Sequence, residues 1–173
     1  DGVYRGGLGG FEKLPVGDQL PHPMVVAALE DRLGGQWFGT RKGLAYRPAD
    51  GPRLQTVKEL GASMVSTLLM DDDGSVLAGG VEGLFRIRGN AVTRIDLSAL
   101  GEVGAISALA RDARGRIWLG HEAGVGLRED GRWRAAGGRG AGELSVFSLS
   151  PFGEGVLAAG FGSLSYVDAE RIQ

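Results

Sequence analysis

The sequence predicts an all-β fold made of β-propeller blades, each with four antiparallel strands, and three observations support this prediction. Glycine makes up 32 of the 173 residues beside only 6 prolines, which indicates a chain rich in tight turns. A pattern of short apolar strands returns about every 40 residues. Each copy has room for four strands, and four-stranded units at this spacing are typical of propeller blades.

The repeat occurs in four full copies. The copies start at Val25, Val65, Ile106 and Val146. A glycine closes the second strand of the first three copies, at Gly39, Gly79 and Gly120, and Ala159 takes this place in the fourth. These positions are 40, 41 and 39 residues apart. A leading half copy is also present, because the GVYR of residues 2–5 repeats the GLFR of residues 83–86.

Within each copy the first two strands are joined by a tight turn. An Asp-x-x-Gly sequence recurs between them, at 31–34, 71–74 and 112–115. A turn aspartate can accept hydrogen bonds from its own backbone, and the glycine can take a positive φ, which suits a hairpin. The second strands carry a large apolar residue at one position: Trp37, Leu77, Trp118 and Leu157. We expect these side chains to pack against neighbouring blades, because one blade cannot bury both faces of its sheet.

The outer half of each copy also has hairpin signals. The third strand is followed by Asp50-Gly51, Gly89-Asn90 or Asp130-Gly131, and a fourth strand such as 91–95 or 132–134 comes next. No stretch has trustworthy helical spacing, so Glu59-Leu60 and Ala99-Leu100 are assigned to loops. The blades are predicted at 1–20 (half), 24–60, 64–98, 105–136 and 144–173.

About four and a half blades do not close a ring. Residues 1–14 supply only an outer hairpin, and the chain ends the fourth strand of its last blade near Arg171, Ile172 and Gln173. We therefore expect an excerpt of a larger propeller, completed by further blades of the same chain or by self-association, since an open sheet edge invites association.

Composition excludes several functional classes. A net charge of −2 and a pI near 5.7 provide no basic surface for nucleic acid. The chain has no cysteine, hence no disulfide and no thiol nucleophile. The longest apolar run, 24–29, is far shorter than the roughly 20 residues that span a bilayer, so no membrane contact is expected in this segment. No signal peptide is visible at the start, and no cofactor motif was found.

The combination of Asp-x-x-Gly, Trp-x-Gly-Thr and Gly-Leu resembles the two-component regulator propeller repeat. The clearest copies are EDRLGGQWFGTRKGL at 30–44 and RDARGRIWLGHEAGV at 111–125. The second copy departs from the pattern at Leu77, and the fourth at Pro151 and Leu157. The resemblance implies the sensor region of bacterial hybrid histidine kinases and related receptors. It further implies a periplasmic or extracytoplasmic, non-catalytic module that recognises a ligand.

Candidate ligand-binding residues follow from comparing the copies. Residues that recur serve the blade: Trp37, Gly39, Thr40, Asp71, Gly74, Trp118 and Gly120. Residues that vary in the turn between the second and third strands are expected around the channel mouth: Arg41, Lys42, Glu82, His121, Glu122 and Phe161. The loops 21–23 and 62–63, with Glu102 and Arg139, are expected beside them. Such a set could bind a small polar molecule such as a saccharide; alternatively, these are solvated loop residues.

Two other functions stay open. His121 could act as a general base, as in propeller lyases that degrade macrocyclic antibiotics, although its neighbour Glu122 would point the other way along an extended strand. The chain could also be a scaffold for protein interaction. No metal site is predicted, because the acidic run 71–73 lacks the distal glutamate of a calcium loop. The glycines of 137–142 are assigned to a flexible loop rather than a phosphate cradle.

Overall fold

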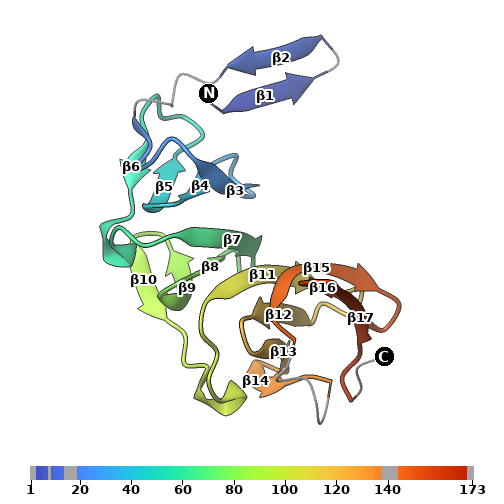
Figure 1. Ribbon diagram of the computed structural model, residues 1–173. Helices are drawn as coiled ribbons and strands as arrows, with labels where there is room; N and C mark the ends of the chain where they lie inside the picture. Colours follow the sequence, from blue (N-terminus) through green and yellow to red (C-terminus); the bar gives the residue numbers. More distant parts are fainter. Residues whose placement is uncertain (1–2, 8, 14–18, 138–143, 171–173) are drawn as a thin grey trace.

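The computed structural model describes residues 3–7, 9–13, 19–137 and 144–170, and within them regular structure is almost entirely β (Figure 1). Two single 3₁₀ turns, η2 (Lys58–Leu60) and η3 (Ser98–Leu100), form where loops were expected. Each lies in a linker between blades. The all-β class and the propeller blades of the sequence prediction are confirmed.

Each blade is an antiparallel sheet whose strands follow one another in chain order. The first blade consists of β3 (Val25–Glu30), β4 (Gln36–Thr40), β5 (Gly43–Arg47) and β6 (Gln55–Thr56). The second consists of β7 (Val65–Met70), β8 (Val76–Gly80), β9 (Gly83–Arg88) and β10 (Ala91–Arg94). The third consists of β11 (Ile106–Arg111), β12 (Ile117–His121), β13 (Gly124–Glu129) and β14 (Arg132–Ala135).

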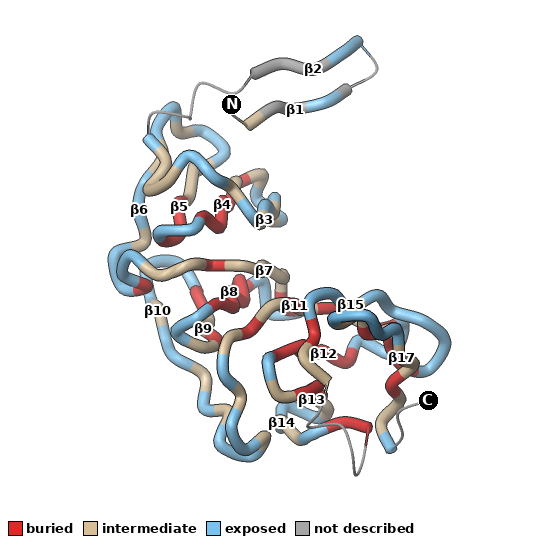
Figure 2. The backbone as a smooth tube through the Cα atoms, viewed as in Figure 1, coloured by how far each residue is buried: buried red, intermediate tan, exposed pale blue. Residues whose placement is uncertain are grey.

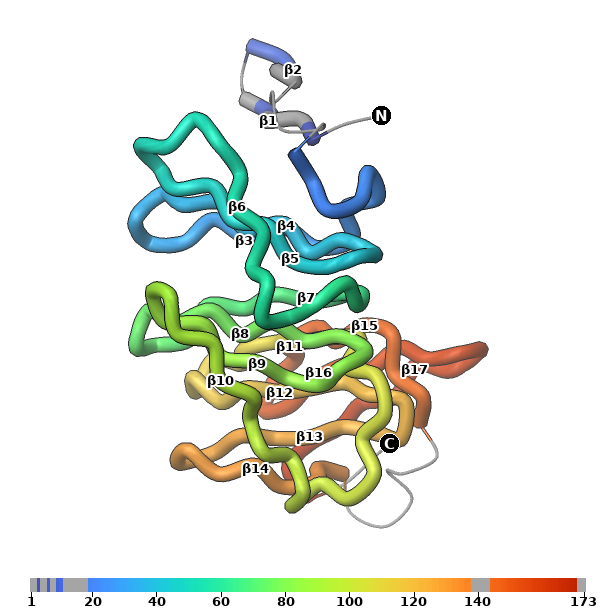
Figure 3. Tube along the Cα trace, turned by 90° about the vertical axis from the view of Figure 1, so that its left-hand side faces the viewer, coloured from blue at the N-terminus to red at the C-terminus, as the bar shows by residue number. Residues whose placement is uncertain are grey.

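The two ends of the chain form smaller sheets. The last blade has β15 (Val146–Phe152), β16 (Gly155–Gly160) and β17 (Ser163–Val167), and its predicted fourth strand near 171–173 lies outside the described residues. The leading half copy forms a two-stranded hairpin of β1 (Tyr4–Gly7) and β2 (Gly10–Lys13), beyond the first blade (Figures 1 and 3). Arg139 and most of the glycine run 137–142 also fall outside the described part of the chain.

The blades meet along their first strands. β3 contacts β7, β7 contacts β11, and β11 contacts β15. All four strands carry an irregularity at the same repeat position, occupied by Val26, Ser66, Ser107 and Phe147. The Ser66 hydroxyl donates to the Ile106 carbonyl, and the Ser107 hydroxyl donates to the Val146 carbonyl. These side chains join the first strand of one blade to that of the next.

The core lies between consecutive blades, as Figure 2 shows for the buried segments of β4, β8 and β12. Trp118 is fully buried against Val146, Val156 and Val167 of the last blade. Leu77 of the second blade packs in the same way with Ile106 of the third. Burial of this apolar surface, at about 25 cal/mol per Å², gives the blades their mutual attachment.

The turn aspartates hold the tryptophans of the second strands. The Trp37 indole Nε1 donates to Asp31 Oδ2 at 2.9 Å, and the Trp118 Nε1 donates to Asp112 Oδ2 at the same distance. The other carboxylate oxygen of each aspartate accepts backbone N–H groups of its own turn. Gly115 closes the third-blade turn at φ 80°, a conformation that favours glycine.

Asp71, the turn aspartate of the second blade, binds arginines instead of an indole. Its carboxylate accepts two bonds from Arg128 of the next blade, at 2.7 and 2.6 Å, and one from Arg86 at 2.9 Å. Arg111 approaches it to 3.4 Å. The second copy has Leu77 where the first and third copies have tryptophan, so ion pairs around the buried Asp71 carboxylate replace the Asp–Trp pair.

Candidate functional site

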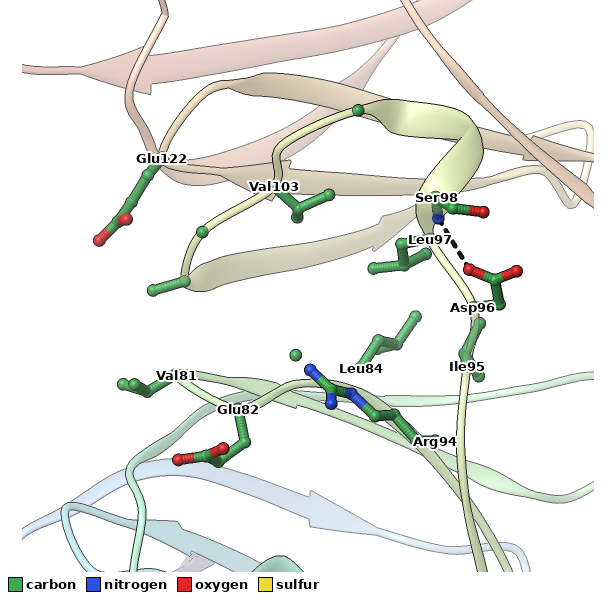
Figure 4. Close-up of a pocket in the computed structure, with 14 residues that line it drawn as sticks. Val81, Glu82, Leu84, Arg94, Ile95, Asp96, Leu97, Ser98, Val103 and Glu122 are labelled. Atoms are coloured by element: carbon green, nitrogen blue, oxygen red, sulfur yellow. Dashed lines mark hydrogen bonds between the residues drawn. The ribbon is translucent and has the colours of Figure 1, made fainter.

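A cleft of about 870 Å³ opens between the second and third blades (Figure 4). One wall is the turn from β8 to β9 with the end of β10, and the other is the linker that carries η3 to β11, together with the turn after β12. Its lining residues are Val81–Leu84, Arg94–Ser98, Gly101, Val103–Ala105 and Glu122. Loops of two blades therefore converge on one space, so a molecule bound there would contact both.

Apolar side chains form one part of this cleft. Leu84 is fully buried, and Ile95, Leu97 and Val103 are half-buried along the linker. Arg94 extends into the space between the walls in Figure 4, and its guanidinium lies over Gly83. Gly83 has φ 109°, and a Cβ there would come within 3.4 Å of Nη2 of Arg94. The glycine thus gives the turn its conformation and leaves room for the arginine.

Some charged side chains of the cleft have hydrogen-bond partners within the protein, and others do not. The Glu82 carboxylate accepts a bond from the Ser63 hydroxyl at 2.8 Å. The Asp96 carboxylate accepts the Ser98 N–H at 2.9 Å, and hydrogen bonds from Ser98 lower the pKa of Asp96. Arg94 and Glu122 are exposed and make no ion pair within the described residues. An arginine and a carboxylate are therefore available on opposite walls.

Of the six predicted mouth residues, the cleft brings together Glu82 and Glu122. Arg41 and Lys42 are exposed on the first-blade turn and do not line it. Phe161 is 86% exposed on the last blade and stacks edge-on against Phe147, with ring centroids 4.3 Å apart. The six predicted residues occupy equivalent turns, but these turns belong to four different blades. Only the turns of the second and third blades meet at this cleft.

His121 is buried and bonds the linker that precedes its blade. The residue is 4% exposed, and Nδ1 lies 2.9 Å from the Val103 carbonyl oxygen and 3.2 Å from the Ala123 backbone nitrogen. One nitrogen cannot both donate and accept, and the shorter contact to a carbonyl requires that Nδ1 carries the proton. Thr40, at the equivalent position, also bonds backbone groups, but of its own hairpin: its hydroxyl donates to the Gly43 carbonyl and accepts the Lys42 N–H. Hence His121 takes the place of a structural threonine.

We expect His121 to make the protein less stable at pH 5 than at pH 7. Burial lowers the pKa of His121 below its usual 6.5, so the folded state favours the neutral ring while the unfolded chain takes up a proton. The stability contributed above pH 6.5 is then lost as the pH falls through the folded pKa. Urea unfolding at both pH values should show the loss in the native chain, and His121→Thr should reduce it. An equal loss in the variant would contradict the assignment.

The sequence did not single out Arg94, Asp96 or the apolar residues of the linker. The available signal was position, because residues 95–105 connect two blades beside the predicted mouth. The inter-blade loops were expected to flank the mouth, and Ser63, from one of them, does hold Glu82. Glu102 was named from the correct linker, yet its neighbours Gly101 and Val103 line the cleft instead.

Comparison with known proteins finds similarity at the level of the fold. No protein-family model matches the sequence, and no curated protein matches it. The extracellular domain of the hybrid two component system BT3049 from Bacteroides thetaiotaomicron superposes with a TM-score of 0.72 at 16% identity, over 94% of this chain and 23% of that one. The extracellular domain of the one component system BT4673 from the same organism gives 0.67 at 14%, over 92% and 23%.

An enzyme has the same fold. Catalytically inactive virginiamycin B lyase from Staphylococcus aureus, with quinupristin, gives a TM-score of 0.68 at 13% identity, covering 96% of this chain and 59% of the lyase. These likenesses show the fold alone. The chain is a set of propeller blades. It spans less than a quarter of the two signalling domains.

The described residues contain neither a membrane-spanning helix nor a cluster of metal ligands. None of their helices is long and apolar enough to cross a membrane. No group of three or more histidine, cysteine or acidic side chains is arranged there to hold a metal ion.

Proposed function

We propose that this chain is a non-catalytic ligand-recognition module of an extracytoplasmic bacterial signalling receptor of the two-component type. The cleft between the second and third blades is the observation that carries the proposal, because it offers Arg94 and Glu122, which have no ion-pair partner among the described residues, above apolar side chains. The fold likeness to extracellular domains of two signalling systems supports the cellular setting. The ligand class is a small polar molecule, saccharides included.

The site suggests how binding could produce a signal. Its walls belong to two blades, so a ligand that contacts both favours one arrangement of those blades over others. A ligand shifts a conformational equilibrium only by its difference in affinity between the two states. Contacts made to both walls at once supply such a difference.

We expect Arg94→Ala and Glu122→Ala each to weaken ligand binding about tenfold or more. A hydrogen bond to a charged group is worth about 1.5 to 3 kcal/mol, and about 1.4 kcal/mol corresponds to a factor of ten. Isothermal titration of the chain with neutral and acidic mono- and disaccharides, amino acids and dicarboxylates would find a binder and measure its Kd. Arg41→Ala, on an exposed turn outside the cleft, is the matched control and should leave Kd unchanged.

Two results would count against this proposal. If Arg41→Ala weakens binding while Arg94→Ala does not, the ligand binds elsewhere on the mouth. If no probe binds at millimolar concentration, the recognition function itself fails for this class of molecule.

The lyase alternative has the fold likeness to virginiamycin B lyase in its favour. It needs an accessible general base, whereas His121 is buried with Nδ1 engaged by the Val103 carbonyl. Activity toward a streptogramin such as quinupristin that disappears in His121→Thr, with folding intact, would favour the lyase over the sensor.

A further inference from the structure

Within the described part of the chain, no strand packs over one sheet face of the last blade, and this face carries exposed apolar side chains. Leu164 is 69% exposed, although the equivalent Leu44, Leu84 and Val125 of the other blades are at most 1% exposed. Phe161 lies on the same blade with Phe147 stacked against it. The polar residues of β15 and β17 are serines and Tyr166, and no charged side chain occurs in either strand. In the other blades this face is covered by the next blade.

Three junctions within the chain show how the face is covered. A glycine of the second strand, Gly39, Gly79 or Gly120, lies against the branched residue that begins the next blade. A Cβ on Gly79 would meet Ile106 Cγ2 at 2.7 Å, and one on Gly120 would meet Val146 Cγ1 at 2.5 Å. A Cβ on Gly39 would meet the Val65 carbonyl oxygen at 2.6 Å and Cγ1 at 3.2 Å. None of these distances leaves room for a methyl group.

The last blade departs from this pattern because it has a residue with a Cβ where the other blades have glycine. Ala159 occupies the position of the three glycines and pairs with Ser148 and Leu164 as they pair with their own neighbours. Its Cβ therefore stands where the branched side chain of a following blade would lie. Overpacking of this kind forces backbone shifts and is destabilising.

We propose that the exposed face of β15–β17 is a docking surface for a further propeller blade whose first strand begins with glycine, alanine or serine instead of valine or isoleucine. Continuity with the three existing junctions identifies the partner as a blade, and Ala159 fixes the residue it must carry. A second copy of this chain does not satisfy the requirement, because its full blades begin with Val25, Val65, Ile106 and Val146. This inference is independent of the proposed ligand-binding function.

The proposal is testable by extending the chain with a blade of known sequence. A copy of residues 95–136, which includes the third blade and its preceding linker, is fused after residue 173. The copy carries either Ile106 or Ile106→Ala, and the parent chain carries either Ala159 or Ala159→Gly. A Leu164→Cys substitution reports on the face, since the chain has no other cysteine and this thiol is exposed when the face is free.

The reaction of this thiol with Ellman's reagent gives the readout. We expect the thiol to react at least 100-fold more slowly than in the unextended chain in two fusions, Ala159 with Ile106→Ala and Ala159→Gly with Ile106. The fusion with Ala159 and Ile106 should react nearly as fast as the unextended chain. Leu33→Cys, on an exposed turn of the first blade, should react rapidly in every fusion and serves as the control.

Three results would overturn the proposal. Equal protection in all fusions would remove the steric role of Ala159, and protection in none would mean that the face does not receive a blade. Protection in the unextended chain that increases with protein concentration would identify a second copy as the occupant.

Discussion

Trp118→Ala should lower the free energy of unfolding by about 3 to 5 kcal/mol, the usual cost of emptying a buried tryptophan site. Trp118 is fully buried between the third and last blades, so its removal leaves a cavity at the junction. Its indole also donates to Asp112, and the Arg116 guanidinium lies over the ring at 5.4 Å from its centroid. The carboxylate keeps the Arg116 Nε bond at 2.7 Å, so the main cost is lost packing.

Urea unfolding at pH 7 measures this effect. Phe161→Ala is the matched aromatic control, because Phe161 is 86% exposed, and its effect should stay within about 0.5 kcal/mol. Trp118→Phe should cost less than Trp118→Ala, since phenylalanine fills much of the site but cannot donate to Asp112. If Trp118→Ala unfolds like the native chain, the packing between these two blades does not carry the stability assigned to it.

The repeat made the blades predictable from sequence. Gly115 and the Asp112 carboxylate are demanded by a local turn, so their spacing is visible along the chain. Trp37 and Trp118 share one repeat position because each packs against the blade that follows it. The predicted fold class, the hairpins and the inter-blade position of Trp118 agree with the structure for this reason.

The site was only partly predictable. Glu82 and Glu122 were found because they vary within a repeated turn, and they do line one cleft. Arg94 comes from the end of a fourth strand, where no repeated motif marks it. The burial of His121 depends on the Val103 carbonyl, which belongs to a linker 18 residues away, and sequence spacing gave no sign of that contact.

In the core of the second copy, too, the sequence did not reveal a contact between distant residues. Its Leu77 looked like a lost tryptophan, and the compensating residue is in another blade. Trp37 packs near Ile87, and Trp118 packs near Val167. Arg128 has the position of these aliphatic residues at the junction of the second and third blades, and it reaches Asp71. A large indole with an aliphatic neighbour has thus been exchanged for a leucine with an arginine that pairs with the turn carboxylate.

This exchange predicts that Asp71→Asn will be as damaging as the loss of a tryptophan. The Asp71 side chain is 4% exposed and meets Arg86, Arg111 and Arg128. Removing one partner of a buried ion pair costs about 3 to 5 kcal/mol, and the mostly buried Arg128, whose side chain is 14% exposed, would lose its carboxylate partner. Asp72→Asn is the control. Asp72 also pairs with Arg111, but its side chain is 75% exposed, so its loss should cost at most about 1 kcal/mol.

The pH dependence of the free energy of unfolding tests whether the charge of Asp71, rather than the packing of its side chain, stabilises the fold. Burial alone would raise the pKa of Asp71, but the hydrogen bond and charge of Arg128 and the charge of Arg86 hold it far below its usual value. A lowered folded pKa gives stability that is present above the unfolded pKa, near 3.9, and is lost as the pH falls. Between pH 7 and pH 3 the native chain should lose roughly 1 kcal/mol more than Asp71→Asn. Equal losses in the two proteins would mean that the arginines hold the blades together without needing the charge on Asp71.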